Sequence, residues 1–497
     1  MMIALVNPRS ARWNHRIPLS LLAVASGLEG KFDYRIVDQN YDNHIEQTLE
    51  SLIDQHDLRL VGITVMPGPQ LSNAILISQF LKRRHPAVRI IWGGTFSTIH
   101  VDTVLSSPLV DFVVWSQGEF ALPELISAIE AGSPLENVRG ISFKRGGSIV
   151  HNASREWVHP DLLPPMPYHK VDVGRYLQRT YLGNRTTGYH SSFGCPFLCG
   201  FCSVVAMFQG KWLAQKPETV VRDLLFLKEK HGIDSVEFFD DNFFVSEKRT
   251  LEFSQRVKAL NLSWWGEGRS DTLLKYSDMT LRSMRESGCK MIFTGAESSS
   301  METLEIMNKG GTQSPETLLA FAERIQEFDI IPEFSFIFGS PNEDVDASID
   351  RDINFIRQIK KVNPRSEIIF YVYSPVLLPG AEIFELAKKF GFEYPKTLEE
   401  WLLPKWQNLG LRRNPMTPWI TSKHITKIRN FERVFNAYFP TISDLKLTAS
   451  RKKLLRLISG WRYQSRFYLA PYEIRFVLSK LLKYRQPEIE GAEQYVV

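Results

Sequence analysis

Three cysteines stand close together in the chain, as Cys195, Cys199 and Cys202 in a CxxxCxxC spacing. Thiolates at such short separations suit zinc or an iron–sulfur cluster. A structural zinc site uses four protein ligands, and the only further cysteine, Cys289, lies far along the chain. Three ligands on a four-iron cube would instead leave one iron open for substrate. The spacing therefore predicts a metal centre on these three cysteines, with zinc as the alternative to a cluster.

Alternating strands and helices surround the cysteine segment. Six short apolar runs are typical of strands, and each is followed by a helical pattern such as 218–231 or 273–287. The first run ends directly before the cysteines. Six successive strand–helix units predict a closed or partly closed parallel barrel. The predicted strands are 189–193, 236–239, 262–265, 291–294, 334–338 and 368–373.

A second set of strands precedes this barrel. Five apolar runs alternate with helical patterns up to about residue 131, which is the pattern of a doubly wound parallel sheet. A hairpin at 141–144 and 148–150 is predicted as a terminal addition to that sheet. The predicted parallel strands are 3–6, 34–37, 60–65, 88–92 and 112–115.

We therefore predict an α/β chain of four parts. The doubly wound domain covers 1–151, and a proline-rich linker covers 152–187. The barrel covers 188–380. A helical C-terminal region without strands covers 381–497.

The cysteine segment, at the end of the first strand of a six-fold strand–helix domain, resembles the radical S-adenosylmethionine superfamily. The resemblance implies a [4Fe–4S] cluster on Cys195, Cys199 and Cys202, with S-adenosylmethionine chelated at the open iron. An electron from the reduced cluster would split the sulfonium to a 5′-deoxyadenosyl radical. Phe201 matches the aromatic position that lies near the adenine in this superfamily, with loop packing as the alternative.

Polar residues follow the later strands of the predicted barrel, where ligands of such folds gather. Asp240 or Asp241 could accept hydrogen bonds from the methionyl ammonium, or could cap the next helix. Arg269 could meet the methionyl carboxylate or form a structural ion pair. Glu297 is placed to bind the ribose hydroxyls. Cys289 is interpreted as a small buried side chain at the opposite end of the barrel.

Glycine-rich strand ends in the first domain resemble the cobalamin-binding module of the B12-dependent radical S-adenosylmethionine family. Glycine lets backbone approach a large planar macrocycle closely, although a tight turn also explains the Gly93-Gly94 pair. The Asp-x-His-x-x-Gly pattern, which supplies a histidine to cobalt in methionine-synthase-type modules, is absent, so His100 is interpreted as a surface residue. The resemblance implies cobalamin contacts from Gly62, Gly93, Gly94, Gly118 and Glu119.

Bulk composition limits the class of protein. The 497 residues are 43% hydrophobic and 23% charged, which is typical of a folded globular chain. Four cysteines in so long a chain do not make a disulfide framework, so we expect a reducing, cytoplasmic location. No apolar run approaches the ~18 residues of a membrane-spanning helix. The cluster would need an electron donor such as flavodoxin or ferredoxin.

The segment 451–485 is strongly basic and carries only one acidic residue, Glu473. Aromatic residues are interleaved with the bases on helical patterns. Such a segment could seat the protein on an anionic membrane surface, or it could be a solvated face over a small helical subdomain. The net charge of +5 is small for this length and no recognised nucleic-acid-binding module is present, so we expect no nucleic-acid partner.

These observations leave three hypotheses of function. The first is a cobalamin-dependent radical methyltransferase, in which methylcobalamin delivers a methyl group to a substrate carbon activated by hydrogen abstraction and two S-adenosylmethionine molecules are consumed. The second is an oxidative or ring-forming enzyme with the same cofactors, similar to the anaerobic magnesium-protoporphyrin ester cyclase. The third is a zinc-stabilised binding or cobalamin-sensing protein. The aromatic content and the helical tail favour a large apolar substrate, such as a lipid or a tetrapyrrole.

Overall fold

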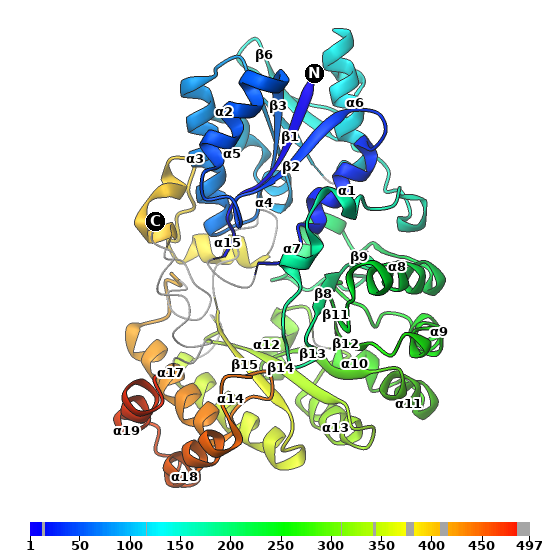
Figure 1. The fold of residues 1–497 in the computed structure, drawn as a ribbon. Coiled ribbons are helices and arrows are strands. Elements are labelled where there is room, and N and C mark those ends of the chain that lie inside the picture. The colour runs from blue at the N-terminus through cyan, green and yellow to red at the C-terminus, as the bar shows by residue number, and fades with distance from the viewer. Residues whose placement is uncertain are drawn as a thin grey trace.

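The computed structural model describes residues 1–11, 15–115, 117–309, 311–340, 344–373, 382–407 and 416–484. These residues form two larger β-sheets and one small two-stranded sheet, with helices packed around them. The first large sheet lies in the upper part of Figure 1, mostly in blue, and the second lies below it in green and yellow. The α/β class predicted from the sequence is confirmed.

The first sheet has seven strands in the order β2-β1-β3-β4-β5-β6-β7. The strands β1 to β5 run parallel, and β6 and β7 add an antiparallel hairpin at one edge. A sheet covered by helices on both faces needs apolar residues on both sides, and all six residues of β1 are buried. The strands are β1 Met2–Asn7, β2 Asp33–Asp38, β3 Leu58–Thr64, β4 Arg89–Gly93, β5 Phe112–Val114, β6 Ile141–Arg145 and β7 Ser148–His151.

Helices cover both faces of this first sheet. Because strand side chains alternate between faces, Ile3 and Leu5 pack with α1 and α6, whereas Ala4 and Val6 pack with α2 and α3. This two-sided cover is the doubly wound arrangement that the sequence predicts. The four helices are α1 Leu19–Leu28, α2 Ile45–His56, α3 Pro69–Arg84 and α6 Gly118–Ala131.

The second sheet is a partial barrel of six parallel strands in the order β15-β14-β13-β12-β11-β8. Helices pack on its outside over an aromatic core that includes Phe238, Phe253 and Trp264. The strands are β8 Thr186–Tyr189, β11 Ser235–Phe238, β12 Ser263–Gly268, β13 Cys289–Glu297, β14 Ile331–Phe338 and β15 Glu367–Val372. The outer helices include α8 Pro217–His231, α9 Glu247–Val257, α11 Asp278–Glu286, α13 Pro315–Gln326 and α14 Val345–Val362.

The first barrel strand lies earlier than the predicted 189–193. After β8 the chain leaves the barrel and forms a short strand, β9, that pairs antiparallel with β10. It turns away because Asp240 accepts hydrogen bonds from both the N–H and the hydroxyl of Ser191, a contact that no local pattern reveals. These two strands are β9 Ser192–Gly194 and β10 Trp212–Ala214.

The predicted helix 273–287 is interrupted. A short helix, α10 (Ser270–Leu273), ends first, and α11 begins anew after Ser277. The Ser277 hydroxyl accepts a hydrogen bond from the N–H of Thr280, which is the usual N-terminal cap. The local cap therefore overrides the longer apolar periodicity.

The C-terminal region divides between the two sheets. Phe392 and Trp401 belong to the core of the first sheet. The helix α17 (Ser422–Tyr438) instead packs on the barrel, where the ring centres of Phe431 and of Phe370 in β15 lie 5.7 Å apart. Figure 1 shows α15 (Glu382–Lys389) near the first domain and α17 beside the barrel. None of the described helices is long and apolar enough to cross a membrane.

Candidate functional site

The three clustered cysteines lie in the loop between β9 and the helix α7 (Ser203–Phe208) and are partly accessible. The N–H of Gly200 donates to the carbonyl oxygen of Met307 at 2.9 Å. The Nδ2 of Asn308 donates to the carbonyl oxygen of Leu198 at 2.6 Å. Hydrogen bonds to a distant part of the barrel therefore hold the loop in place.

Two side chains present N–H groups to the cysteine sulfurs. The Nδ2 of Asn242 lies 3.6 Å from the Sγ of Cys195. The Nη1 of Arg269 lies 3.6 Å from the Sγ of Cys199. Contacts of this kind stabilise negative charge on thiolates and on the metal centre that they bind.

The donor set fits an iron–sulfur cluster. Burial raises the pKa of the Cys195 thiol and raises that of Cys202 to about 12. Such thiols need a nearby positive charge to remain thiolates, and a bound metal centre supplies it.

Arg269 is buried beside the cysteine loop. Its guanidinium forms an ion pair with Asp271 at 2.8 Å and lies 4.1 Å from the centre of the Phe197 ring. The structural ion pair that the sequence left as an alternative is thus present. Because the same guanidinium reaches Cys199, the ion pair also positions it against the loop.

Glu297 ends β13 in a left-handed backbone conformation with a φ of 64°. The Nζ of Lys309 lies 2.5 Å from its Oε1 and donates to the carbonyl oxygen of Gly295 at 2.7 Å. A Cβ on Gly295 would lie 2.0 Å from the same Oε1 and 2.5 Å from the Lys309 Nζ, so any other residue would displace the two charged groups from these positions. The pair fixes the Glu297 carboxylate at the carboxyl end of the strand.

The two aspartates after β11 have different surroundings. Asp240 is fully buried and accepts hydrogen bonds from Ser191 and Ser192 at 2.5 to 2.7 Å. Asp241 accepts one hydrogen bond from the N–H of Gly194 and remains accessible to solvent. Desolvation by the surrounding protein still raises the pKa of the Asp241 carboxyl to about 6. Asp241 is therefore free to receive a ligand, whereas Asp240 shapes the turn.

Phe201 is partly buried next to the last cysteine of the loop. It packs against Met307 and Tyr373, and the Nζ of Lys309 lies 6.0 Å from the centre of its ring. The loop packing that the sequence left as an alternative is present, and the ring lies near the residue that holds Glu297.

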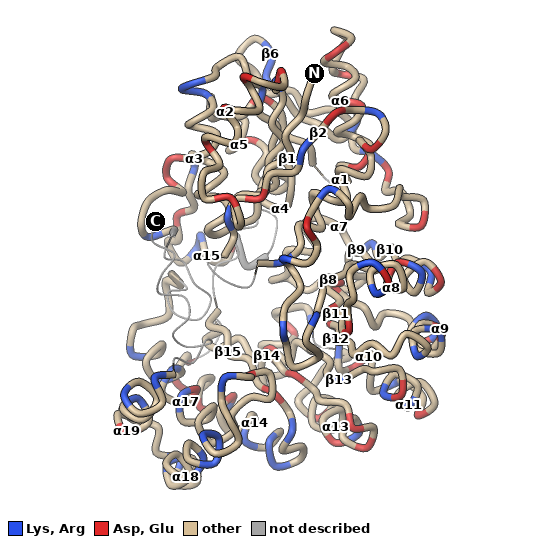
Figure 2. The backbone as a smooth tube through the Cα atoms, in the orientation of Figure 1, with Lys and Arg blue, Asp and Glu red and all other residues tan. Residues whose placement is uncertain are grey.

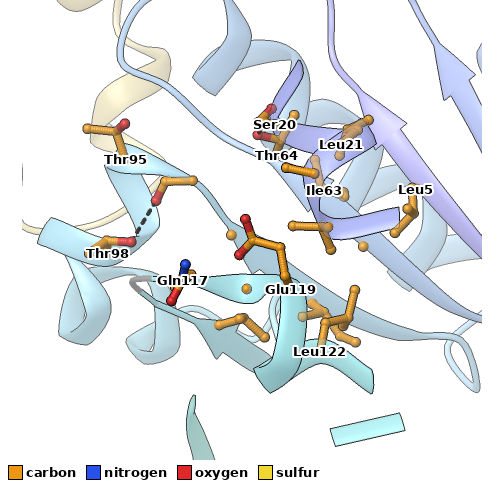
Figure 3. Close-up of a pocket in the computed structure, with 18 of the residues that line it drawn as sticks. Leu5, Ser20, Leu21, Ile63, Thr64, Thr95, Thr98, Gln117, Glu119 and Leu122 are labelled. Carbon is orange, nitrogen blue, oxygen red and sulfur yellow. Dashed lines mark hydrogen bonds between the residues drawn. The ribbon is translucent and has the colours of Figure 1, made fainter. Parts of the chain in front are cut away.

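A cleft opens at the carboxyl ends of β3, β4 and β5 in the first domain (Figure 3). It encloses about 1070 Å³, including the part open to solvent. Apolar side chains and backbone form most of its wall, which suits a large ligand with little charge. The residues predicted to contact cobalamin all line it: Gly62, Gly93, Gly94, Gly118 and Glu119.

Two adjacent glycines shape this cleft in different ways. Gly94 has a φ of 90°, and a Cβ there would lie 2.8 Å from the carbonyl oxygen of Val65, so other residues would be strained. A Cβ on Gly93 would meet only the carbonyl oxygen of Val114, at 3.5 Å. A side chain at position 93 would therefore fit the backbone and occupy the cleft.

Glu119 brings a carboxyl group into the cleft. Its side chain extends from the start of α6 toward the middle of the lining residues (Figure 3). Burial raises the pKa of this carboxyl, which widens the pH range in which it is neutral. A neutral carboxyl both donates and accepts hydrogen bonds, as the amide side chains of a corrin require. The cleft therefore fits cobalamin.

The cleft and the cysteine loop adjoin each other. Phe193, just before the cysteine segment, lines the cleft, and so do Met207 and Phe208 just after it. The helix α4 (Thr95–Ile99) of the first domain also contacts α7 (Ser203–Phe208). One continuous region of the molecule thus contains both predicted sites.

The interpretation of His100 as a surface residue is wrong. The residue is buried, with its ring centre 4.6 Å from that of Phe96 and 5.9 Å from that of Trp401. Trp401 comes from the C-terminal region, so a contact between segments far apart in the sequence buries the histidine.

Several residues that shape the sites were missed by sequence reasoning. A Cβ on Gly27 would lie 1.9 Å from the carbonyl oxygen of Glu119, so this glycine lets α6 begin against α1. Lys309 precedes two glycines in the sequence, which was an available signal for a tight loop. Asn242 and Asp271 act through tertiary contacts and gave no signal of their own.

Family models match two separate parts of the chain. Residues 15–126 match the B12 binding domain, and residues 189–356 match the Radical SAM superfamily. The first match spans the glycine-lined cleft and the second spans the cysteine loop. The cofactors are therefore cobalamin, a [4Fe–4S] cluster and S-adenosylmethionine.

Curated relatives share about two thirds of the chain. An uncharacterized methyltransferase of Pyrococcus horikoshii is 29% identical over 339 residues, which are 67% of this chain and 72% of the relative. The anaerobic magnesium-protoporphyrin IX monomethyl ester cyclase of a Synechocystis species is 26% identical over 361 residues, which are 68% of this chain and 71% of the relative.

A solved structure shows the same fold. The cobalamin-dependent S-adenosylmethionine radical enzyme OxsB, with aqua-cobalamin and S-adenosylmethionine bound, matches with a TM-score of 0.69 at 18% identity, over 97% of this chain and 75% of that chain. This likeness concerns the fold, and the two matched domains, B12 binding and Radical SAM, place the chain among the cobalamin-dependent radical S-adenosylmethionine enzymes.

Proposed function

We propose that the protein is a radical C-methyltransferase that adds a methyl group to an unactivated carbon of a small molecule. The observation that carries this proposal is the shared wall of the two sites, because Phe193 and Phe208 flank the cysteines and also line the cleft. When bound, the cluster with S-adenosylmethionine supplies a hydrogen-abstracting radical and cobalamin supplies the methyl group. A substrate carbon between the two sites would be within reach of both.

In this proposal the cysteine loop holds the cluster through Cys195, Cys199 and Cys202. Asn242 and Arg269 orient two of these thiolates through their N–H···S contacts of 3.6 Å. The hydrogen bonds from Gly200 and Asn308 keep the loop at the mouth of the barrel. These residues therefore set the position of the cluster.

We assign the S-adenosylmethionine contacts to the ends of the barrel strands. Glu297, fixed by Lys309, binds the ribose hydroxyls, and Asp241 accepts hydrogen bonds from the methionyl ammonium. Phe201 packs near the adenine. Arg269, already paired with Asp271, acts on the cluster loop and does not need to bind the methionyl carboxylate.

We assign cobalamin to the cleft of the first domain. Gly62, Gly93, Gly94 and Gly118 leave room for backbone to approach the macrocycle, and Glu119 offers a hydrogen-bonding carboxyl group. Phe193, Met207 and Phe208 from beside the cysteine segment complete the wall of this cleft.

We propose that the substrate is a small molecule with a large apolar body. Among the relatives, one is a bacteriochlorophyllide d C-8(2)-methyltransferase and another is a hopanoid C-3 methylase, so tetrapyrroles and polycyclic lipids are the classes to test first. In the barrel, Trp265 and Phe293 lie on neighbouring strands with ring centres 6.3 Å apart and are only partly buried. Such aromatic surface suits a ligand with a large apolar body.

Product mass tests the proposal against its main alternative. Metabolites of the organism with and without this protein would be compared by mass spectrometry. A methyltransferase predicts that the mutant accumulates a compound lighter than the normal product by one methylene unit. Growth with methionine carrying a deuterated methyl group should label the same product.

The second candidate function is an oxidative cyclase, which the magnesium-protoporphyrin ester cyclase among the relatives favours. It predicts a mutant metabolite that differs by hydrogen or oxygen and carries no additional deuterium from methionine. That result would overturn the methyl-transfer proposal while leaving the cofactors unchanged.

The proposed reaction needs electrons from outside the chain. We infer that a small electron carrier such as flavodoxin or ferredoxin supplies them. Reduction of the reconstituted cluster by each carrier in turn, followed by electron paramagnetic resonance, tests this directly. If neither carrier reduces the cluster although dithionite does, the inference is wrong.

A further inference from the structure

The helices α18 (Ala449–Ser465) and α19 (Tyr472–Phe476) expose many large apolar side chains. On α18, the buried face packs on α17, where Tyr463 stacks on Tyr438 with ring centres 4.7 Å apart. Leu457 and Trp461 lie one turn apart on another face and are 78% and 54% exposed. The helix therefore has one apolar face inside the protein and a second one in solvent.

The exposed apolar surface continues from α18 through the following loop to α19. The rings of Trp461 and Phe467 stack with centres 5.9 Å apart, and Leu469, which follows, is 68% exposed. We call this surface the C-terminal apolar patch. It consists of Leu454, Leu457, Trp461, Phe467, Leu469, Tyr472, Phe476 and Leu481.

Arg462 gives the patch a fixed shape. It is buried, forms an ion pair with Glu473 and donates to the carbonyl oxygen of Leu469 at 2.7 Å. Its guanidinium also lies 4.8 Å from the Trp461 ring centre and 5.1 Å from that of Phe467. The loop between the two helices is thus held in place with its apolar side chains outward.

The charges of the segment that carries the patch are nearly all of one sign. Glu473 is the only acidic residue between positions 449 and 484, and Arg462 neutralises it. Figure 2 shows Lys and Arg in blue on α18 and α19. The exposed basic residues are Arg451, Lys453, Arg456, Arg466, Arg475, Lys480 and Lys483.

We propose that the C-terminal apolar patch docks the protein on an anionic lipid surface. Such a surface accepts apolar side chains into its acyl boundary and attracts the basic residues around them. A second copy of the chain would bring like charges together across a twofold interface, and a nucleic acid would leave the leucines in water. This inference concerns binding and does not depend on the methyl-transfer proposal.

Vesicle sedimentation of the full-length protein tests the proposal. Wild-type protein should sediment with phosphatidylglycerol vesicles at low salt and remain in the supernatant with phosphatidylcholine vesicles. Attraction between exposed charges is screened over about 10 Å at ~0.1 M salt, so binding should weaken as salt rises. Retention in the supernatant with anionic vesicles at low salt would overturn the proposal.

Two sets of variants separate the contribution of the basic residues to vesicle binding from that of the apolar residues. Each basic residue near an anionic surface contributes about 1 kcal/mol, so Arg451→Glu, Lys453→Glu and Arg456→Glu together should weaken vesicle binding by at least about a hundredfold. Lys452 is left unchanged because it donates to the carbonyl oxygen of Thr441. The matched control reverses exposed bases of the first domain, as Lys31→Glu, Arg83→Glu and Arg89→Glu.

The apolar set replaces Leu457, Leu469 and Phe476 by Ser. It should bind at low salt and detach at lower salt than wild type, because only the charges then hold it. Replacement of exposed Leu162 and Met279 by Ser is the control. If both sets bind vesicles as wild type does, or if the protein binds duplex DNA but not vesicles, the patch is not a lipid-docking surface. Circular dichroism and the cluster absorption show that each variant is folded.

Discussion

The cysteine loop and the cobalamin cleft differ in the kinds of residues that form them. Around the cysteine loop, polar side chains contact one another in pairs, as in Arg269 with Asp271 and Lys309 with Glu297. In the cleft, glycines and apolar walls create space, and Glu119 enters it with a raised pKa. The first site is specified by bonding groups and the second by shape.

This difference explains how well each site could be predicted. Three cysteines at a fixed spacing indicate a metal centre by themselves, so Cys195, Cys199 and Cys202 could be predicted from the sequence alone. A glycine indicates only which backbone conformations are allowed. Gly93 was therefore predicted to contact cobalamin only in combination with the cysteine loop elsewhere in the chain. The family matches to both parts agree with that combined interpretation.

The largest change should follow from removing a cysteine of the cysteine loop. Replacing Cys195, Cys199 or Cys202 by Ala should remove nearly all iron, because two thiolates do not hold a four-iron cube. Cys289 is fully buried at the start of β13, so Cys289→Ala should keep wild-type iron content. Iron analysis after anaerobic reconstitution checks both. Equal iron loss from Cys289→Ala and Cys195→Ala would show that the three-ligand assignment is wrong.

The second largest change should follow from filling the cobalamin cleft with a side chain. Gly93→Leu should place a side chain in the cleft and weaken cobalamin binding by about a hundredfold or more, a loss of roughly 3 kcal/mol, with iron content unchanged. Gly93→Ala is the matched variant, since its Cβ makes only ordinary contact, and it should lose much less. Cobalamin retention by absorbance after gel filtration measures the difference. Full retention by Gly93→Leu would place cobalamin elsewhere.

A smaller effect should follow from removing one N–H···S contact. Asn242→Leu keeps the size of the side chain but removes the donor to Cys195. One hydrogen bond of about 1 kcal/mol corresponds to roughly 40 mV for one electron, so the reduction potential of the cluster should fall by about that amount. A redox titration followed by electron paramagnetic resonance measures it. Asn363→Leu, which removes a buried donor to Ala322, should leave the potential unchanged.

The smallest effect concerns the carboxyl group of the cleft. Burial raises the pKa of Glu119 in the folded protein, so its contribution favours folding below the unfolded pKa and is lost as pH rises through the folded pKa. Glu119→Gln removes this dependence. The free energy of unfolding of the variant, relative to that of the wild type, should therefore increase as the pH rises from about 5 to about 8. Urea unfolding at the two pH values measures this difference. An identical difference at the two pH values would show that burial does not raise the pKa of the Glu119 carboxyl in the folded protein.

Some features could not have been predicted because they depend on contacts across the fold. The burial of His100 requires Trp401, and the turn that ends β8 requires Asp240. The sequence predicted most of the strands of both domains, since each is an apolar run of its own, but it placed the first barrel strand at 189–193 instead of Thr186–Tyr189. It predicted Arg269 as important without deciding its partner, because Asp271 and the cysteine loop meet only in three dimensions.

In the proposed function, one chain joins a radical-generating cluster to a methyl-donating cobalamin. The most direct test is to incubate the anaerobically reconstituted protein with reductant and S-adenosylmethionine and to quantify 5′-deoxyadenosine and S-adenosylhomocysteine in the same sample. Wild type should form both, Cys195→Ala should form only S-adenosylhomocysteine, and Gly93→Leu should form only 5′-deoxyadenosine. If the wild type forms neither product, or if each variant loses both products while it retains its other cofactor, the two cofactors do not act as proposed.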